Sequence, residues 1–213
     1  MHASAARRSP AGIIQGQLDT LLNAKGEDQA QLTATALRTE HVTRILSSPL
    51  QRAFRTAEAI AAHHPGAVLE ANELLKERAF GVLEGNVYRG PANKPEDTVG
   101  IETTNALADR LSQFWAQLQR DLEADPERNA CVVVVSHGAA LSALLNHVLL
   151  AEGHAVRASH VAPSRLWNCS VSEVVVPAAH GKVAEIVRWA DVAHLDVAKP
   201  GTNVPLRNVD ESI

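Results

Sequence analysis

The sequence predicts an α/β protein in which a mixed, mostly parallel sheet carries helices on both faces, forming a three-layer sandwich. Three observations predict it. Apolar segments alternate with segments of helical period, a uniform apolar run at 130–135 is typical of a strand buried on both faces, and 46% of the 213 residues are hydrophobic, enough for a core. Such a sheet ordinarily begins with an apolar strand, and none precedes Ile13. We therefore expect the sheet to lack its first strand.

Helix and strand alternate in the first third of the chain. Residues 27–39 have the helical period and acids in their first turn, which suit the positive end of a helix dipole. The β-branched segment 42–46 favours a strand. From Pro49 the helical period resumes, with proline near the first turn, where it is well tolerated. A strand therefore leads into a helix through residues 47–48, and 67–69 predict a further short strand.

The middle of the chain contains turns, a surface segment and a long helix. Residues 74–85 predict a charged loop. The segment 86–100 contains two glycines and two prolines, and it predicts a surface excursion of the kind that often controls substrate access. Apolar residues at helical spacing over 107–122 predict an amphipathic helix.

The last third of the chain is predicted to form the remaining strands of the sheet and one helix. The strand 130–135 is followed by a helical pattern over 139–150. Two more apolar segments, 166–176 and 183–189, are separated by a short polar connection, so they predict an antiparallel hairpin. Five strands are expected in all.

We expect one domain at 13–190, preceded by an irregular segment at 1–12 and followed by a polar tail at 191–213. The net charge is −4 and the 20 Lys and Arg residues are scattered, which argues against nucleic-acid binding. No stretch approaches the roughly 20 apolar residues of a membrane span. Cys131 and Cys169 lie in apolar segments and predict buried, reduced thiols, which favours a cytoplasmic location and leaves a nuclear one open.

His137 is the first candidate site residue. The tripeptide Ser136-His137-Gly138 follows the apolar strand and opens the next helix. Loops at the carboxyl ends of strands are where α/β proteins bind ligands, and the start of a helix attracts anions. The imidazole is therefore placed to meet a phosphate. The alternative is a histidine that only caps the turn.

Arg52 is the second candidate. It lies one helical turn into the segment opened by Ser48-Pro49-Leu50, so its guanidinium can reach back over the end of the preceding strand. A guanidinium can bind two phosphate oxygens at once, which a lysine cannot. Arg55 is the rival, and an ordinary exposed helical arginine is the alternative for both.

Glu77 is the third candidate, because apolar residues flank its short segment. Partial loss of water would favour the protonated carboxyl, which could then donate a proton to a leaving oxygen, whereas the neighbouring Arg78 opposes that effect. The alternative is a surface ion pair between Glu77 and Arg78. The competing carboxylates are Glu73, Glu84 and Glu102.

The sequence also carries several short motifs in a particular order and spacing. They are Ile14-Gln15-Gly16 with Asp19, Ser47-Ser48-Pro49-Leu50-Gln51-Arg52, Glu77-Arg78-Ala79-Phe80-Gly81, Glu84-Gly85 and Ser136-His137-Gly138. Together they resemble the histidine phosphatase superfamily, in its phosphoglycerate mutase-like branch. Within it, they are more similar to small fructose-2,6-bisphosphatase-like phosphatases than to the glycolytic mutases.

The resemblance implies a phosphatase that works in two steps through a phosphohistidine. Glu77 would protonate the leaving oxygen, and Arg52 and His137 would clamp the phosphate. Gln15, Gly16 and Arg78 would bind substrate. The implied partner is a small phosphorylated metabolite such as a sugar phosphate, with no metal ion, cofactor, nucleic acid or membrane required. The identity of the substrate and the oligomeric state are left open.

One departure from the superfamily pattern keeps two alternatives open. The nucleophilic histidine belongs to an Arg-His-Gly motif about a dozen residues before the Gln-Gly pair, and the matching residues here are Met1-His2-Ala3. A role for His2 is left open. The chain is therefore either a phosphatase or a catalytically inactive phosphate-binding relative, or truncated form, that lacks the nucleophile. A nucleotide-binding module is a weaker alternative, because no Gly-x-Gly-x-x-Gly or Walker-type motif follows a strand.

Overall fold

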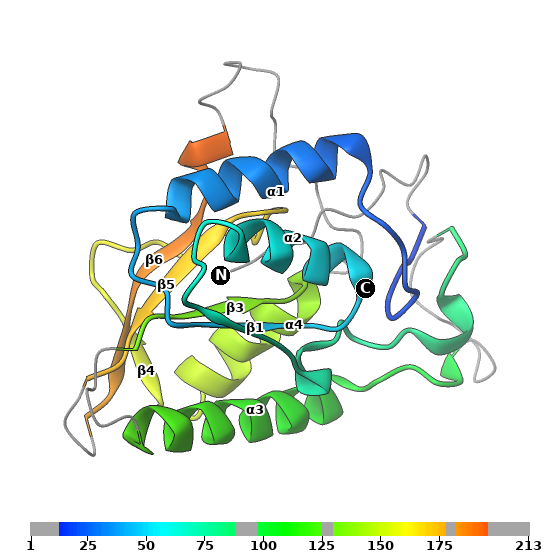
Figure 1. Cartoon of the computed structure of the whole chain (residues 1–213). Coiled ribbons are helices and arrows are strands. Elements are labelled where there is room, and N and C mark those ends of the chain that lie inside the picture. The colour runs from blue at the N-terminus through cyan, green and yellow to red at the C-terminus, as the bar shows by residue number, and fades with distance from the viewer. Residues whose placement is uncertain (1–12, 88–97, 125–129, 178–181, 196–213) are drawn as a thin grey trace.

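The computed structural model describes residues 13–87, 98–124, 130–177 and 182–195. Two helices lie on one side of the strands and two on the other, as Figure 1 shows, so the predicted three-layer α/β architecture is confirmed. The upper layer in that view holds α1 (Ala24–Leu37) and α2 (Gln51–Ala61), and the lower layer holds α3 (Thr104–Ala124) and α4 (Gly138–Ala143).

The first sheet has the order β2-β1-β3, and its strands are parallel. The strands are β1 (Arg44–Ser47), β2 (Val68–Ala71) and β3 (Val132–Val135). In the central strand, Ile45 and Leu46 are buried on opposite faces, because both faces are covered by helices. All three strands were predicted within two residues of their observed positions.

The second sheet has the order β4-β6-β5. Its strands are β4 (Ala155–Arg157), β5 (Val171–Val175) and β6 (Ala184–Asp191). The predicted antiparallel hairpin is confirmed for β5 and β6, whereas β4 is parallel to β6. Among the described residues, hydrogen bonds thus join the strands into two sheets and not into the single sheet expected.

The second sheet differs from the prediction in two places. Residues 166–170 do not form part of a strand, because the chain turns there and Cys169 has a left-handed backbone with φ of 57°. The three-residue strand β4 was missed, since so short a segment carries no readable alternation.

The helices begin and end close to their predicted positions. Helix α1 starts at Ala24, before the predicted residue 27, because the side chain of Asn23 accepts a hydrogen bond from the Gly26 amide at 2.8 Å and caps the helix. Helix α4 passes into a π-helical turn at Leu144–Leu150, which ends at the predicted residue 150. Within the described ranges, short 3₁₀ helices lie at Glu73–Leu75, Gly81–Leu83 and Ala193–Leu195. Most of the predicted excursion at 86–100 falls outside the described residues.

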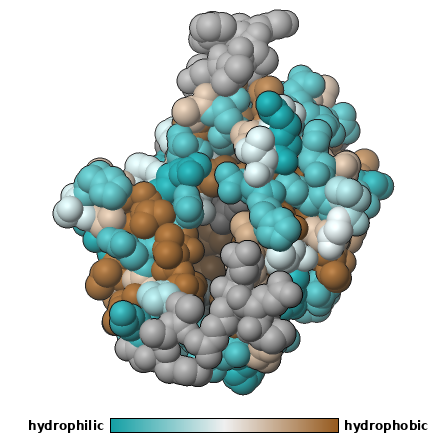
Figure 2. All heavy atoms as spheres, turned by 60° about the vertical axis from the view of Figure 1, so that its left-hand side comes forward, coloured by the Kyte–Doolittle hydropathy of each residue, from teal (hydrophilic) through white to brown (hydrophobic). Residues whose placement is uncertain are grey.

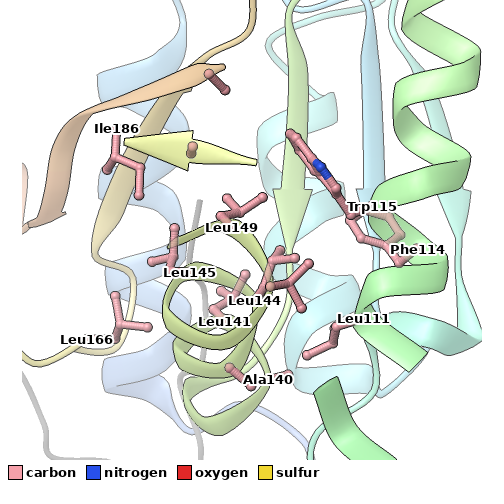
Figure 3. Packing of buried hydrophobic residues seen from close by; sticks show 14 of the residues in the cluster. Leu111, Phe114, Trp115, Ala140, Leu141, Leu144, Leu145, Leu149, Leu166 and Ile186 are labelled. Carbon is pink, nitrogen blue, oxygen red and sulfur yellow. The ribbon is translucent and has the colours of Figure 1, made fainter. Parts of the chain in front are cut away.

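Two apolar clusters hold the layers together, and each combines residues from the two sheets or from segments directly beside them. In the larger one, Leu144 and Leu145 in the π-helical continuation of α4 lie between Ile186 of β6 and Trp115 of α3, as Figure 3 shows. Leu195 belongs to the other cluster and is fully buried. The packed part of the chain therefore continues past the predicted domain boundary at residue 190.

Part of the second sheet is apolar at its surface. Figure 2 shows hydrophobic side chains around a hollow on the side of the molecule where β4, β5 and β6 lie. Val156 of β4 and Val175 of β5 are about half exposed. No helix in the described ranges combines the length and apolar character that a membrane crossing requires.

Both cysteines are free thiols. Burial raises the pKa of the Cys169 thiol to about 12, and it raises the pKa of the half-buried Cys131 as well. Since the thiolate is the reactive form, both thiols are poor nucleophiles in the folded protein. The prediction of reduced, buried thiols is thus confirmed for Cys169 and is only partly correct for Cys131.

His194 makes stability depend on pH. Its Nε2 lies 3.0 Å from the Thr33 hydroxyl oxygen, and burial lowers its pKa despite opposing effects of the Cys169 carbonyl and Asp191. A lowered folded-state pKa means that the unfolded chain takes up the proton more readily. The stabilisation is therefore complete above about pH 6.5, the ordinary histidine value, and is lost as the pH falls through the folded pKa.

We accordingly expect the free energy of unfolding to decrease between pH 7.5 and pH 5, and the decrease to be smaller in His194→Asn. Urea denaturation at both pH values measures this. His147 is exposed on the helix that follows α4, so His147→Asn is the matched control and should leave the pH dependence unchanged. An equal decrease in all three proteins would rule out His194 as the cause.

Candidate functional site

The three strands of the first sheet each lead into one of the predicted site residues. Ser48 and Arg52 follow β1, Glu77 follows β2 through a short loop, and His137 follows β3. Because the strands are parallel, these segments leave the sheet at the same edge. The side chains of Arg52, Glu77 and His137 are all buried, with exposed fractions of 1%, 0% and 0%.

His137 lies at the N-cap of α4, in extended backbone. Its Nε2 is 2.7 Å from the hydroxyl oxygen of Ser48, at the end of the neighbouring strand. The preceding Ser136 donates its hydroxyl hydrogen to the carbonyl of Leu75 at 2.7 Å, which ties the end of β3 to the loop that carries Glu77. The imidazole is therefore held against the residue that follows β1.

Arg52 lies in the first turn of α2. Its two terminal nitrogens donate to the carbonyl oxygens of Leu18 and Gly16, both at 2.7 Å. The rival Arg55 is 62% exposed and pairs with Glu58 on the same helix. The structure thus separates the two arginines: Arg52 is in the interior beside the loop 14–18, and Arg55 is on the surface.

The Glu77 carboxylate receives three backbone hydrogen bonds. Oε1 accepts from the amides of Arg78 at 2.8 Å and Ala140 at 3.0 Å, and Oε2 accepts from the Ala139 amide at 3.2 Å. The last two amides belong to the first turn of α4, directly after His137. The carboxylate of Glu77 is thereby held next to the end of the strand that leads into His137, and the alternative that Glu77 lies at the surface is wrong.

The three competing carboxylates have other roles. Glu73 is largely exposed and pairs with Lys76. Glu84 accepts hydrogen bonds from the amides of Gln17 and Phe80 through one oxygen, at 2.9 and 2.8 Å. Glu102 is bound by Arg110. These contacts leave Glu77 as the carboxylate that touches the first turn of α4.

Gln15 and Gly16 belong to the loop that lies over Arg52. Gln15 is buried, and Gly16 has a left-handed backbone with φ of 49°. A Cβ atom added at Gly16 would lie 2.2 Å from Oε1 of Glu84. Only glycine can therefore occupy this position without moving Glu84.

Gly16→Ala is expected to lower the free energy of unfolding by about 2–4 kcal/mol, because it adds a strained backbone conformation to a steric clash. Urea denaturation measures the change. Gly66→Ala is the control, since Gly66 has no atom within 4 Å of the added Cβ and no left-handed backbone. A Gly16→Ala protein as stable as the control would contradict the tight contact with Glu84.

Arg78 is held from two sides. Its Nε donates to the carbonyl of Glu102 at 2.8 Å, and its guanidinium carbon lies 5.1 Å from the centre of the Phe80 ring. These contacts hold the Arg78 guanidinium group in place, and Arg78 directly follows Glu77 in the chain. A substrate-binding role for Arg78 stays a prediction.

Sequence reasoning gave no role to several residues that organise the site, although Asp19 belongs to the motifs that carry the family resemblance. Gln17 donates its side-chain amide to the carbonyl of Glu77 at 2.9 Å, and Asp19 accepts from the backbone and side-chain amides of Gln51 at the start of α2. Arg110 reaches the Glu77 loop from α3. Gln17 and Asp19 stand close to the Gln-Gly motif, which was a usable signal. Arg110 gave none, because an arginine in a long amphipathic helix is most often exposed.

These contacts link the three candidates into one cluster. Arg52 holds the loop 14–18, Gln17 of that loop holds Glu77, and Glu77 holds the start of α4 next to His137. A guanidinium, an imidazole and a carboxyl group are the groups needed to bind a tetrahedral anion and to deliver a proton. No group of three or more His, Cys, Asp or Glu side chains in the described part of the chain could hold a metal ion.

Comparisons with known proteins point to one family. A family model described as the histidine phosphatase superfamily (branch 1) matches residues 2–191. A probable phosphatase of Schizosaccharomyces pombe is 31% identical over 196 residues, which cover 89% of this chain and 90% of the relative. A probable phosphoglycerate mutase of Shigella boydii is 33% identical over 196 residues, covering 86% and 87%.

Solved structures with the same fold include two named phosphatases. The α-ribazole phosphatase of Shigella flexneri superposes with a TM-score of 0.71 at 20% identity and covers 90% of this chain and 94% of its own. The native mycobacterial glucosyl-3-phosphoglycerate phosphatase superposes with a TM-score of 0.61 at 26% identity, covering 70% and 77%.

Proposed function

Because this chain belongs to branch 1 of the histidine phosphatase superfamily, we propose that it hydrolyses a small phosphorylated metabolite, such as a sugar phosphate, through a phosphohistidine intermediate. The observation that carries the proposal is the buried cluster of Arg52, Glu77 and His137 at the carboxyl edge of the first sheet. The names of the relatives support phosphate esters of small molecules as the substrate class.

Each residue has a separate role in the proposed reaction. Arg52 and His137 bind the phosphoryl oxygens and neutralise their charge, which is most of what a protein contributes to phosphoryl transfer. A histidine nitrogen attacks phosphorus, the ester bond to the leaving oxygen breaks, and the protonated carboxyl group of Glu77 gives that oxygen its proton. Water then attacks the phosphohistidine and passes a proton to the Glu77 carboxylate, which releases inorganic phosphate and restores both the imidazole and the acid. Gln15, Gly16 and Arg78 bind the part of the substrate that leaves as the alcohol.

The proposal is tested by phosphate release from an aryl phosphate in the presence of EDTA. We expect turnover with EDTA, and we expect it to be lost in Arg52→Ala and in His137→Ala. Activity that disappears with EDTA, or that survives unchanged in both variants, would refute the mechanism. Trapping the phosphoenzyme from labelled substrate and mapping the acid-labile phosphohistidine would identify the nucleophile, with His2 and His137 as the two residues to distinguish.

A second candidate function is phosphate binding without turnover. It is favoured by one observation: the tripeptide Arg-His-Gly does not occur in the sequence, and the residues that match it are Met1-His2-Ala3, without the arginine or the glycine. Such a protein would keep Arg52 and His137 as ligands. Its sign is an increase in melting temperature with inorganic phosphate or a sugar phosphate in a protein that releases no phosphate from any ester. Enzyme-like phosphate release from the 213-residue chain would eliminate it.

A further inference from the structure

Arg110 of α3 binds the main chain of the loop that carries Glu77. Its Nη1 donates to the carbonyl of Leu74 at 2.6 Å, and its Nη2 donates to the carbonyl of Glu77 at 3.1 Å. The same guanidinium donates to both carboxylate oxygens of Glu102, at 2.7 and 3.0 Å. One side chain thus joins the start and the end of the segment 74–77 to a partly buried acid.

Glu102 binds the main chain at Ala79, which follows Glu77 in the loop. Its Oε2 accepts from the Ala79 amide at 3.2 Å, and its own amide donates to the Ala79 carbonyl at 2.9 Å. Its carbonyl accepts from the side chain of Arg78. The pair of Arg110 and Glu102 therefore holds the main chain before, at and after Glu77.

We propose that Arg110, oriented by Glu102, is a positioning residue that fixes the carboxyl group of Glu77 for proton transfer. The inference rests on the proposed phosphatase function for its catalytic consequence, although the contacts stand independently of it. Among the described residues, the hydrogen bonds and ion pairs of Arg110 reach neither the side chains of Arg52 and His137 nor the Glu77 carboxylate. It acts through the main chain of the loop.

The geometry requires an arginine. A guanidinium presents five donors in a rigid fork, and here four recorded hydrogen bonds use that fork toward two carbonyls and a carboxylate. A lysine ammonium would keep the charge next to Glu102 but could not serve acceptors in these directions together. The side chains of Arg110 and Glu102 are 16% and 13% exposed, so little water can replace the lost bonds.

The consequence for catalysis depends on the leaving group. An alcohol leaves poorly as an alkoxide and needs the proton of the general acid, whereas an acidic phenol leaves almost as well without it. A displaced Glu77 should therefore slow the hydrolysis of alkyl phosphates far more than that of aryl phosphates. A loss of folded protein would lower both rates equally.

The first test compares Arg110→Met with Arg44→Met. Arg44 is a matched control, because it also pairs with an acid of α3, Asp121, but stands at the opposite end of β1 from the site. We expect kcat on an alkyl phosphate to fall about 10- to 100-fold in Arg110→Met, with KM changed less than about 3-fold and the aryl phosphate rate nearly kept. Arg110→Lys should recover thermal stability but not the alkyl phosphate rate. Equal losses on both substrates in Arg110→Met would overturn the inference.

The second test does not depend on turnover. The amides of Ala139 and Ala140 donate to the Glu77 carboxylate, so their hydrogen exchange reports whether that carboxylate is in place. Exchange at both amides should become about 10-fold faster or more in Arg110→Met and stay unchanged in Arg44→Met. Unchanged exchange in Arg110→Met overturns the inference. If the unmutated chain releases no phosphate, the proposed function fails, while the exchange measurement still decides whether Arg110 positions Glu77.

Discussion

Arg52→Met is expected to lower the rate of phosphate release by about 100- to 1000-fold, because the proposed function places this guanidinium against the phosphoryl oxygens and removing one such donor usually has an effect of this size. The buried guanidinium is the strongest positive group in the cluster, and a methionine of similar length supplies no hydrogen bonds. The same change leaves the carbonyls of Gly16 and Leu18 without their donors. Each lost partner costs about 1–3 kcal/mol, so the free energy of unfolding should fall as well.

Two further variants separate binding from folding in this experiment. Arg52→Lys keeps a positive charge but loses the bidentate geometry, so it should recover part of the stability and little of the rate. Arg55→Met removes the exposed arginine three residues away and should change neither quantity. Phosphate release and urea denaturation are measured on all of them. A folded Arg52→Met protein with full activity would remove Arg52 from the proposed site.

Glu77→Gln has the second largest expected effect. Glutamine has nearly the same shape as glutamate, but it carries no transferable proton and offers one oxygen acceptor in place of two. The hydrolysis of alkyl phosphates should slow by about 100- to 10,000-fold, and that of aryl phosphates by much less. Stability should also fall, because amides of Ala139, Ala140 and Arg78 compete for the remaining oxygen.

The control for this prediction is Glu73→Gln in the same loop. Glu73 is 75% exposed and pairs only at the surface with Lys76, so its loss should leave both rates unchanged. The measurement is the ratio of kcat on an alkyl phosphate to kcat on an aryl phosphate. If that ratio is the same in Glu77→Gln and in the unmutated protein, Glu77 is not the proton donor.

Much of the fold could be predicted from local patterns. The unbroken run of valines at 132–135 is typical of a buried strand, and the apolar residues of α3 recur at helical spacing. Both patterns can be recognised from residues that are close together in the chain. The capped start of α1 and the turn around Cys169 were misjudged. A side-chain cap and a residue with left-handed backbone both depend on individual contacts, and the spacing of apolar residues does not indicate such contacts.

The candidate site was predictable where a residue stood next to the end of an element. His137 and Arg52 follow directly from strand ends, and Glu77 was selected by its apolar neighbours. Arg110 could not be found in this way, because its importance comes from carbonyl groups 33 and 36 residues distant along the chain. Main-chain acceptors look the same in every sequence, so no residue type marks them.

The division of the strands into two hydrogen-bonded sheets has a consequence for how such a molecule can vary. Every proposed catalytic group is anchored on the β2-β1-β3 half, whereas the β4-β6-β5 half is joined to it in the described residues by apolar packing, which tolerates changes of shape. We therefore expect substitutions in the β4-β6-β5 half to leave the positions of Arg52, Glu77 and His137 less disturbed than substitutions at the strand ends of the other half.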